Sequence, residues 1–253
     1  MMQLENTAAL VTGGASGLGA ATAKALAEGG AQVFALDLKD GIDKAPEVPG
    51  VTYVPADVTD PEQVGAAVAT AAGSGVPLRT VVNCAGIGPS ARILGKKGVH
   101  DLGLYAKVIQ INLIGTFNVL ALASEAIAAT EADANGQRGV IVNTASIAAY
   151  DGQIGQAAYS SSKGGVVGLT LPAARDLAQY GIRVCTIAPG IVETPMLATV
   201  SDEFRASLAE GVPFPRRLAR PEEYARLALA IVDHDYLNGE TIRMDGALRM
   251  APR

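Results

Sequence analysis

The 253-residue sequence has no tryptophan and only two cysteines and two histidines. Cys84 and Cys185 stand in apolar runs without the spacing of a zinc site, so we expect reduced thiols rather than a disulfide framework. Neither His100 nor His234 has a matching Ser/Asp or metal-ligand arrangement. This pattern argues against a hydrolase or a metalloenzyme and predicts no bound metal.

The sequence also lacks an excess of basic residues. Its formal net charge is −5, which provides no electrostatic attraction to nucleic acid. The first residues, Met1–Asn6, contain no basic segment of a secretory signal. Glycines and charges interrupt every apolar run before the length of about 18 residues that a membrane span needs. We therefore expect a cytoplasmic protein with no nucleic-acid or membrane partner.

Apolar residues make up 49% of the chain, enough for a large core, and short β-rich runs alternate with longer helical patterns. The runs are continuously apolar, as in a parallel sheet covered on both faces. The pattern predicts an α/β fold with a doubly wound, seven-stranded parallel Rossmann-type sheet and helices on both faces. The predicted strands are 7–12, 32–37, 52–55, 80–84, 139–144, 183–188 and 241–244. The predicted helices are 18–28, 61–72, 104–131, 158–180 and 221–235.

No linker, charge run or repeat divides the chain, so we expect a single domain over residues 1–253. Two irregular regions, 86–103 and 189–220, follow strands. Both should therefore emerge at the carboxyl edge of the sheet, where ligands bind in this architecture. The second region is predicted to be a substrate loop.

A glycine-rich run, Thr12-Gly13-Gly14-Ala15-Ser16-Gly17-Leu18-Gly19, separates the first predicted strand from the first helix. Gly13 permits a tight turn, Gly17 admits a pyrophosphate and Gly19 allows close packing of the helix. Backbone amides from Ser16 to Gly19, including that of Leu18, would face the phosphates. The spacing differs from G-x-G-x-x-G, so the run alone is compatible with a glycine turn that binds no nucleotide.

Asp37 closes the second strand, where a carboxylate can accept hydrogen bonds from the ribose hydroxyls of the adenosine. It would repel a 2′-phosphate, and neither Ala15 nor Leu38 is basic, although Lys39 is close. The sequence therefore favours NAD over NADP.

Two further segments have positions suited to the cofactor. Asp57, followed by Val58, can meet the adenine amino group. Asn83, Ala85 and Gly86 lie at the end of the fourth strand, where small residues let the backbone lie beside a ribose.

Tyr159 and Lys163 are four residues apart in a helical pattern and so share one face. A tyrosine acting as a base near pH 7 needs a lowered pKa, and Lys163 and a positive nicotinamide ring are the expected sources. Ser146, at the end of a strand, can hydrogen-bond the substrate oxygen. The three residues together predict proton transfer coupled to hydride transfer.

These motifs resemble the short-chain dehydrogenase/reductase family over essentially the whole chain. The resemblance implies that Asn112 holds a water in a proton relay behind Lys163. It also implies that Pro189, Gly190 and Val192 border the nicotinamide, with Thr194 bonding its carboxamide. Cys84 is a departure, because many members carry a second asparagine there.

A narrower similarity is to the type 2 3-hydroxyacyl-CoA dehydrogenases, a group within this family. It implies NAD as cofactor, short 3-hydroxyacyl-CoA thioesters or hydroxysteroids as substrates, and a homotetramer. Gln156 would contact substrate. Lys96 and Lys97 either meet CoA phosphates or form a solvated basic turn. The segments that carry the similarity are 136–139, 155–159, 171–172, 212–215 and 237–240.

Our leading hypothesis is reversible NAD-linked oxidation of a secondary alcohol, the hydroxyl of a 3-hydroxyacyl-CoA. The alternatives are a hydroxysteroid dehydrogenase, an NADPH-dependent 3-oxoacyl carrier-protein reductase, and a dinucleotide-binding sensor or scaffold without activity. The last need not retain Ser146, Tyr159, Lys163 and Asn112 together. The apolar residues that can line an acyl or a steroid pocket are Ile191, Val192, Met196, Leu197, Phe204 and Leu208.

Overall fold

A computed structural model describes residues 3–96, 98–197 and 202–252. Its main sheet has seven strands in the order β3-β2-β1-β4-β7-β8-β9, and every neighbouring pair is parallel. This confirms the predicted doubly wound sheet, and the strand ends agree closely with the predicted ones. The strands are β1 (Ala8–Thr12), β2 (Gln32–Asp37), β3 (Val51–Pro55), β4 (Leu78–Asn83), β7 (Gly139–Thr144), β8 (Ile182–Pro189) and β9 (Thr241–Met244).

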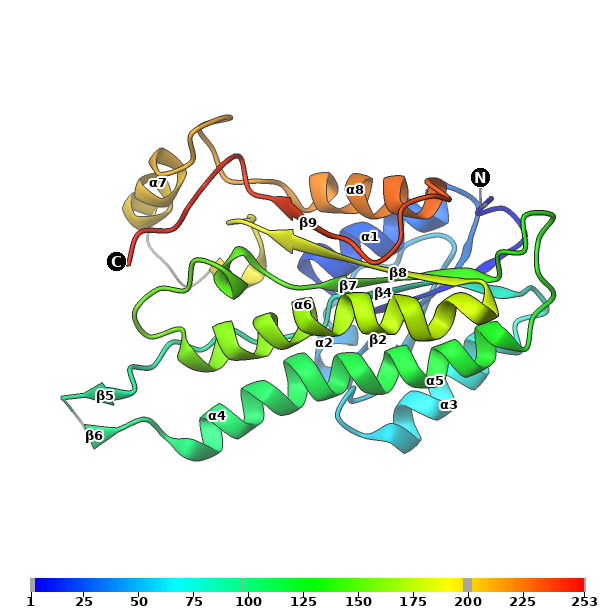
Figure 1. The fold of residues 1–253 in the computed structure, drawn as a ribbon, viewed down its shortest axis with the longest axis horizontal. Helices are drawn as coiled ribbons and strands as arrows, with labels where there is room; N and C mark the ends of the chain where they lie inside the picture. The colour runs from blue at the N-terminus through cyan, green and yellow to red at the C-terminus, as the bar shows by residue number, and fades with distance from the viewer. Residues whose placement is uncertain (1–2, 97, 198–201, 253) are drawn as a thin grey trace.

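Helices cover both faces of the sheet (Figure 1). On one face α1 (Gly17–Glu28) packs beside α8 (Pro221–Asp233). On the other lie α3 (Pro61–Ala72), α5 (Thr116–Ala128) and α6 (Ala157–Leu177). The central strands are buried throughout their length because each face of the sheet lies under a layer of helices.

One long helix replaces the predicted helix 104–131. It consists of α4 (Leu102–Ile109), a π-helical turn η1 (Gln110–Gly115) and α5. The 27 residues Leu102–Ala128 are long and apolar enough to cross a membrane, and their most apolar 18-residue window has a mean hydropathy of 1.5. The prediction that glycines and charges interrupt every such run is therefore wrong. However, 44% of the most apolar window is buried, and α5 packs on α3 while α4 packs on α6, as in a core helix.

The two regions predicted to be irregular contain short elements. Region 86–103 forms an antiparallel hairpin of β5 (Leu94–Gly95) and β6 (Gly98–Val99), which projects from the body of the molecule (Figure 1). Region 189–220 contains the helix α7 (Asp202–Glu210). Sequence patterns missed the hairpin because its strands are two residues long. Additional short elements are α2 (Lys39–Ile42), η2 (Ile147–Ala149), η3 (Ala178–Tyr180) and η4 (Pro195–Leu197).

The carboxyl ends of the strands point to one side of the molecule. In Figure 1 the arrows of β8 and β9 point toward the side that carries α7 and the β5–β6 hairpin. The loops that follow β1, β4, β7 and β8 meet at this edge because all four strands are parallel. The predicted site residues lie in these loops and at the adjoining helix ends.

Candidate active site

The turn between β1 and α1 depends on glycine at particular positions. Gly13 has a φ of 64° and Gly17 a φ of 53°, both in the left-handed region that favours glycine. A Cβ atom on Gly19 would lie 2.1 Å from the carbonyl oxygen of Gly13, so only glycine lets α1 begin this close to the turn. At Gly13 a Cβ atom would lie 2.9 Å from the backbone nitrogen of Ala85. The turn therefore packs directly on the loop after β4.

The amino end of α1 is suited to an anion. Ser16 occupies the N-cap position with extended backbone, but its side chain caps no amide of the helix. The first turn contains no acidic residue. Its free N–H groups and the positive end of the helix dipole therefore remain available to a phosphate group. The residues present fit the pyrophosphate of a dinucleotide.

Asp37 lies at the end of β2 beside this turn. Its Oδ2 accepts a 3.0 Å hydrogen bond from the Ala15 N–H and its Oδ1 a 2.8 Å bond from the Leu38 N–H. Lys39 turns to Asp43, with 2.8 Å between Nζ and Oδ1. The nearest lysine in the sequence is thus already paired with another carboxylate.

Thr12 joins the glycine turn to the loop after β4, a role that the sequence analysis did not assign. Its Oγ1 accepts hydrogen bonds of 3.1 Å from the backbone amides of both Cys84 and Ala85. These two hydrogen bonds fix the backbone just before Gly86. A Cβ atom on Gly86 would lie 3.1 Å from Asn112 Oδ1 and 3.6 Å from Lys163 Nζ, so this backbone borders the predicted catalytic residues.

Asp57, Val58 and Asn83 occupy supporting positions near the same edge. Asp57 Oδ1 accepts bonds from the Thr59 amide at 2.9 Å and from its hydroxyl at 2.8 Å. Val58 is buried against Gly115 of the π-helical turn. Asn83 Nδ2 donates to Asn143 Oδ1 across β4 and β7 at 2.9 Å. The Nδ2 of Asn83 is thus bonded within the sheet and its carbonyl accepts from Thr144 Oγ1, while its Oδ1 is buried without a hydrogen-bond partner in the described structure.

Ser146, Tyr159 and Lys163 come together at the end of β7. Lys163 Nζ donates a 2.8 Å hydrogen bond to the Thr144 carbonyl and lies 5.8 Å from the centre of the Tyr159 ring. Ser146 Oγ accepts a 3.1 Å bond from the Ala148 amide, and its side chain also hydrogen-bonds Tyr159. The predicted trio is therefore one cluster, in which a serine adjoins the tyrosine and a buried cation lies behind it.

Burial shifts the pKa values of both titratable groups of the trio. Burial raises the pKa of Tyr159, and the hydrogen bond with Ser146 offsets only part of that effect. Burial also lowers the pKa of Lys163 to about 8, because an ammonium group loses hydration there. The expectation that Lys163 and a positive nicotinamide ring together lower the pKa of Tyr159 therefore stays a prediction, because the groups of this chain alone do not include that ring.

Asn112 lies fully buried in the π-helical turn. Its Nδ2 donates to the Ile87 carbonyl at 2.9 Å and to Ser162 Oγ at 3.0 Å, while its Oδ1 accepts from the Ile87 amide at 2.8 Å. Both N–H donors and one of the two acceptor positions of Oδ1 are thus occupied. A water held by this side chain can only donate to it.

The loop after β8 reaches the glycine turn. A Cβ atom on Gly17 would lie 3.4 Å from Thr194 Cγ2, so the two predicted cofactor contacts are neighbours. Pro189 ends β8, and the Gly190 amide donates to the Met244 carbonyl at 2.9 Å. Val192 is buried and pairs with Ala219. The predicted nicotinamide contacts therefore border the same edge as Tyr159 and Lys163.

The predicted substrate contacts are more dispersed. Gln156 is the N-cap of α6, three residues before Tyr159, and its Oε1 accepts from the Gln153 amide at 2.9 Å. Lys96 lies exposed in the β5–β6 hairpin, and Lys97 lies outside the described residues. Ile191, Leu197 and Leu208 are half-buried in the loop after β8. The side chains of Met196 and Phe204 lie outside the described part of the chain.

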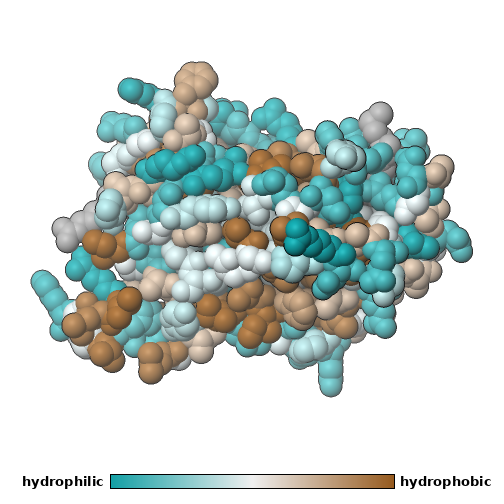
Figure 2. All heavy atoms as spheres, in the orientation of Figure 1, coloured by the Kyte–Doolittle hydropathy of each residue, from teal (hydrophilic) through white to brown (hydrophobic). Residues whose placement is uncertain are grey.

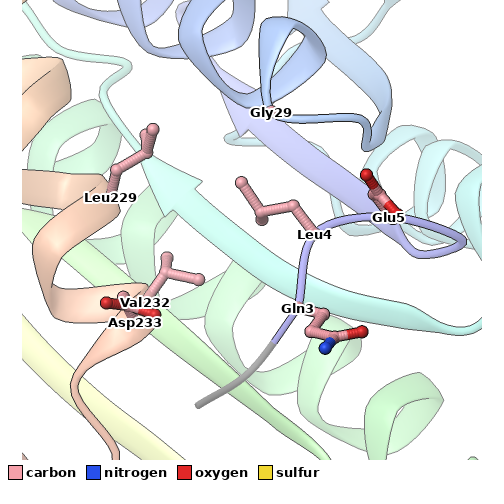
Figure 3. Close-up of a pocket in the computed structure, with 7 residues that line it drawn as sticks. All are labelled: Gln3, Leu4, Glu5, Gly29, Leu229, Val232 and Asp233. Carbon is pink, nitrogen blue, oxygen red and sulfur yellow. The ribbon is translucent and has the colours of Figure 1, made fainter.

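A cavity of about 520 Å³ lies away from this site (Figure 3). Its lining comes from the segment before β1, from the end of α1 and from the last turns of α8, all at the amino edge of the sheet. Because the reactive side chains are at the carboxyl edge, this cavity has no part in the site.

The chain is similar in sequence and in fold to known proteins. A model of the short chain dehydrogenase family matches residues 7–204. The 3-hydroxyacyl-CoA dehydrogenase type-2 of Drosophila melanogaster is 52% identical over 254 residues, covering 98% of this chain and 100% of that protein. The protein of the same name from Homo sapiens is 50% identical and covers 96% of this chain and 95% of its own. The crystal structure of 3-hydroxyacyl-CoA dehydrogenase type-2 from Mycobacterium avium matches with a TM-score of 0.93 and 43% identity, covering 100% of both chains.

Proposed function

The chain belongs to the short-chain dehydrogenase family, and on that premise we propose that it interconverts a 3-hydroxyacyl-CoA and a 3-oxoacyl-CoA with NAD as cofactor. It is an oxidoreductase of that family. The observation that carries the proposal is the cluster of Ser146, Tyr159 and Lys163 beside the glycine turn. The acyl-CoA substrate is supported by identities of 52% and 50% over nearly the full length of two 3-hydroxyacyl-CoA dehydrogenases.

In the oxidative direction, Tyr159 accepts the proton of the substrate hydroxyl. Ser146 Oγ accepts from the Ala148 amide, and its O–H, which bonds Tyr159 in this structure, would turn to donate to the substrate oxygen. As the C=O bond forms, a hydride leaves the carbinol carbon, and NAD, when bound, would supply the acceptor for that hydride. The reverse reaction returns the Tyr159 proton to the carbonyl oxygen.

Lys163 has two tasks in this scheme. One N–H of its ammonium group is held by the Thr144 carbonyl, so two others remain for a ribose hydroxyl of the cofactor. Its positive charge also favours the phenolate form of Tyr159. The pyrophosphate would bind the amides of Gly17, Leu18 and Gly19. Asn112 would pass the proton to bulk solvent through a water that donates to its Oδ1.

The preference for NAD rests on Asp37. Two backbone N–H groups hold its carboxylate at the end of β2, and Lys39 is paired with Asp43. A 2′-phosphate would therefore meet a fixed negative charge without a free lysine to neutralise it.

We further propose a homotetramer located in the cytoplasm. Half-exposed apolar side chains lie along the long helix and on α6, among them Ile114, Phe117 and Leu171. Figure 2 shows apolar residues gathered along this side of the molecule. Such surfaces are suited to helix pairing between subunits. Both cysteines are free thiols, as is usual in a reducing compartment. Light scattering on the protein as it elutes from a sizing column tests the homotetramer. Cell fractionation tests the cytoplasmic location.

The function is tested by following absorbance at 340 nm with acetoacetyl-CoA and either NADH or NADPH. Rapid oxidation of NADH, with NADPH much poorer, is expected. If acetoacetyl-CoA does not react but steroids or other secondary alcohols reduce NAD, the substrate assignment is wrong and the chemistry stands.

The role of Asp37 needs its own variant. Asp37→Ser is expected to raise kcat/KM for NADPH relative to NADH, whereas the exposed Asp40→Ser should leave the ratio unchanged. An unchanged ratio in Asp37→Ser would contradict the assignment.

A further inference from the structure

The segment between Ser146 and Tyr159 is held from two sides by other loops. On one side, the Ala91 amide donates a 2.8 Å hydrogen bond to the Gly155 carbonyl. On the other, the Ile154 amide donates to the Pro252 carbonyl at 3.0 Å. The C-terminal segment, residues 245–252, thus pairs with a loop whose two ends carry the proposed catalytic residues.

Arg243, on β9, anchors this C-terminal segment to the loop. Its Nη2 lies 2.5 Å from Asp151 Oδ2, its Nε lies 2.7 Å from Asp245 Oδ2, and Nη2 also donates to the Leu248 carbonyl at 3.1 Å. The guanidinium stacks 5.1 Å from the centre of the Tyr150 ring. Its side chain is 21% exposed and that of Asp151 is 20% exposed, so solvent screens the pair only in part. One planar group therefore joins the loop, the strand end and the C-terminal segment.

Apolar packing reinforces the same connection. Leu248 is buried in a cluster with Ile147 and Val212, and Ile191 and Met250 pack against it. Ile147 directly follows Ser146, and Val212 lies in the predicted substrate loop. The C-terminal segment is thus packed beneath both sides of the substrate region.

Gln153 relays this support to Gln156. Its Nε2 donates to the Ala251 carbonyl at 2.9 Å, and its backbone amide donates to Gln156 Oε1 at 2.9 Å. Gln156 is the side chain for which substrate contact is predicted. Its orientation therefore depends on contacts that begin in the C-terminal segment.

From these contacts we propose that Arg243 is a positioning residue, which locks the C-terminal segment onto the loop of Asp151 and thereby fixes Gln156 for substrate binding. The part of this proposal that is measured as KM for acetoacetyl-CoA rests on the proposed function. Arg243 acts through Asp151 and contacts none of the proposed catalytic side chains. Lysine cannot replace it, because only the guanidinium fork reaches two carboxylates and a carbonyl together. Displacement of Gln156 would weaken substrate binding and leave the proton-transfer residues in place.

The test uses Asp151→Asn and Arg243→Lys in the full chain. We expect KM for acetoacetyl-CoA to rise roughly tenfold in both, with kcat changed less than about threefold, the pattern of lost binding rather than lost chemistry. NADH affinity, followed by fluorescence, should not change. Amide hydrogen exchange of residues 147–156 should become faster. Arg249→Gln is the matched control, because Arg249 contacts the same Asp245 at 3.0 Å but is 61% exposed, and its hydrogen bonds go to Asp245 and the Leu248 carbonyl rather than to the loop.

A merely structural role predicts a different result. If both variants lower the melting temperature while KM and the exchange of residues 147–156 stay as in the wild type, the proposal is overturned. The exchange measurement needs no substrate. If the wild type fails to reduce acetoacetyl-CoA, the proposed function is wrong, but the positioning role can still be tested by exchange. Faster exchange of residues 147–156 in the Asp151 and Arg243 variants, and not in the Arg249 variant, would support that role. Unchanged exchange would overturn it.

Discussion

Lys163 donates a 2.8 Å hydrogen bond from its Nζ to the main-chain carbonyl of Thr144, which ties the middle of α6 to the carboxyl end of β7. The ammonium group is buried, and the lysine side chain lies 5.8 Å from the centre of the Tyr159 ring. The contact orients the cation toward the site, and burial of the ammonium group removes it from water. Both effects have consequences for stability and activity that can be measured.

The first consequence concerns stability at alkaline pH. Burial lowers the pKa of Lys163 from 10.5 to about 8, so between these values the unfolded chain holds a proton that the folded protein has released. The free energy of unfolding of the wild type, relative to Lys163→Met, should therefore rise from pH 8 to pH 10.5, by at most about 3 kcal/mol. Urea unfolding of both proteins across this range provides the measurement. If the free energies of unfolding of the two proteins change in parallel with pH, the pKa of Lys163 is the same in the folded and unfolded protein.

A second prediction concerns Tyr159→Phe. The change removes only the hydroxyl that is proposed to exchange a proton with substrate, so kcat should fall by about 100-fold or more. NADH affinity should stay within about twofold of the wild type, because the ring remains to pack. Stopped-flow turnover and a fluorescence titration measure the two quantities. Tyr236→Phe is the control, since Tyr236 is 97% exposed in the turn between α8 and β9. Turnover retained by Tyr159→Phe would remove this residue from the mechanism.

Thr12→Val tests the connection between the glycine turn and the loop after β4. Valine has the same shape but cannot accept the bonds from the Cys84 and Ala85 amides. Because Thr12 is buried, we expect a loss of about 1–3 kcal/mol in the free energy of unfolding, together with weaker NADH binding.

Urea denaturation and an NADH titration measure both effects of Thr12→Val. The control is Thr52→Val on β3, where the side chain is exposed and stability should change by less than about 0.5 kcal/mol. Equal stability of the two variants would mean that the Thr12 hydroxyl contributes nothing to the fold.

Gly19→Ala tests the close approach of α1 to the glycine turn. The new methyl group would meet the Gly13 carbonyl oxygen at 2.1 Å, so the turn or the helix must shift. Overpacking of this kind costs about 1–3 kcal/mol and should also disturb the amides that face the phosphates. Melting temperature and NADH affinity should both decrease.

Gly65→Ala is the matched control for Gly19→Ala. A Cβ atom on Gly65, in α3, meets nothing within 4 Å, and alanine is favoured over glycine in a helix by about 1 kcal/mol. The two variants should therefore change stability in opposite directions. A shift of the same sign in both would contradict the steric explanation.

Much of the fold was predictable because its signals are local. Continuous apolar runs mark strands buried on both faces, and the predicted 32–37, 139–144 and 241–244 coincide with β2, β7 and β9. Glycine positions predicted the turn before α1, because glycine adopts the φ of 64° found at Gly13 without the strain that a side chain adds. The i,i+4 spacing of Tyr159 and Lys163 placed both on one helix face.

Other features had no local signal. The π-helical turn at Asn112 lies inside a uniformly apolar pattern, and the β5–β6 hairpin and α7 are too short or too polar to stand out. The supporting roles of Thr12 and Thr144 depend on partners 72 and 19 residues away. No pattern within a single strand can predict such contacts.

The sequence by itself determined the α/β class, the order of strands and helices, and the residues able to carry out proton and hydride chemistry. Backbone propensities, apolar periodicity and steric limits on glycine act over a few neighbouring residues and can be read from them. Only the tertiary structure decided the electrostatics of that chemistry. The pKa of Tyr159 is raised and that of Lys163 lowered because packing of distant segments removes water from both groups, and the removal of water has no local trace in the sequence.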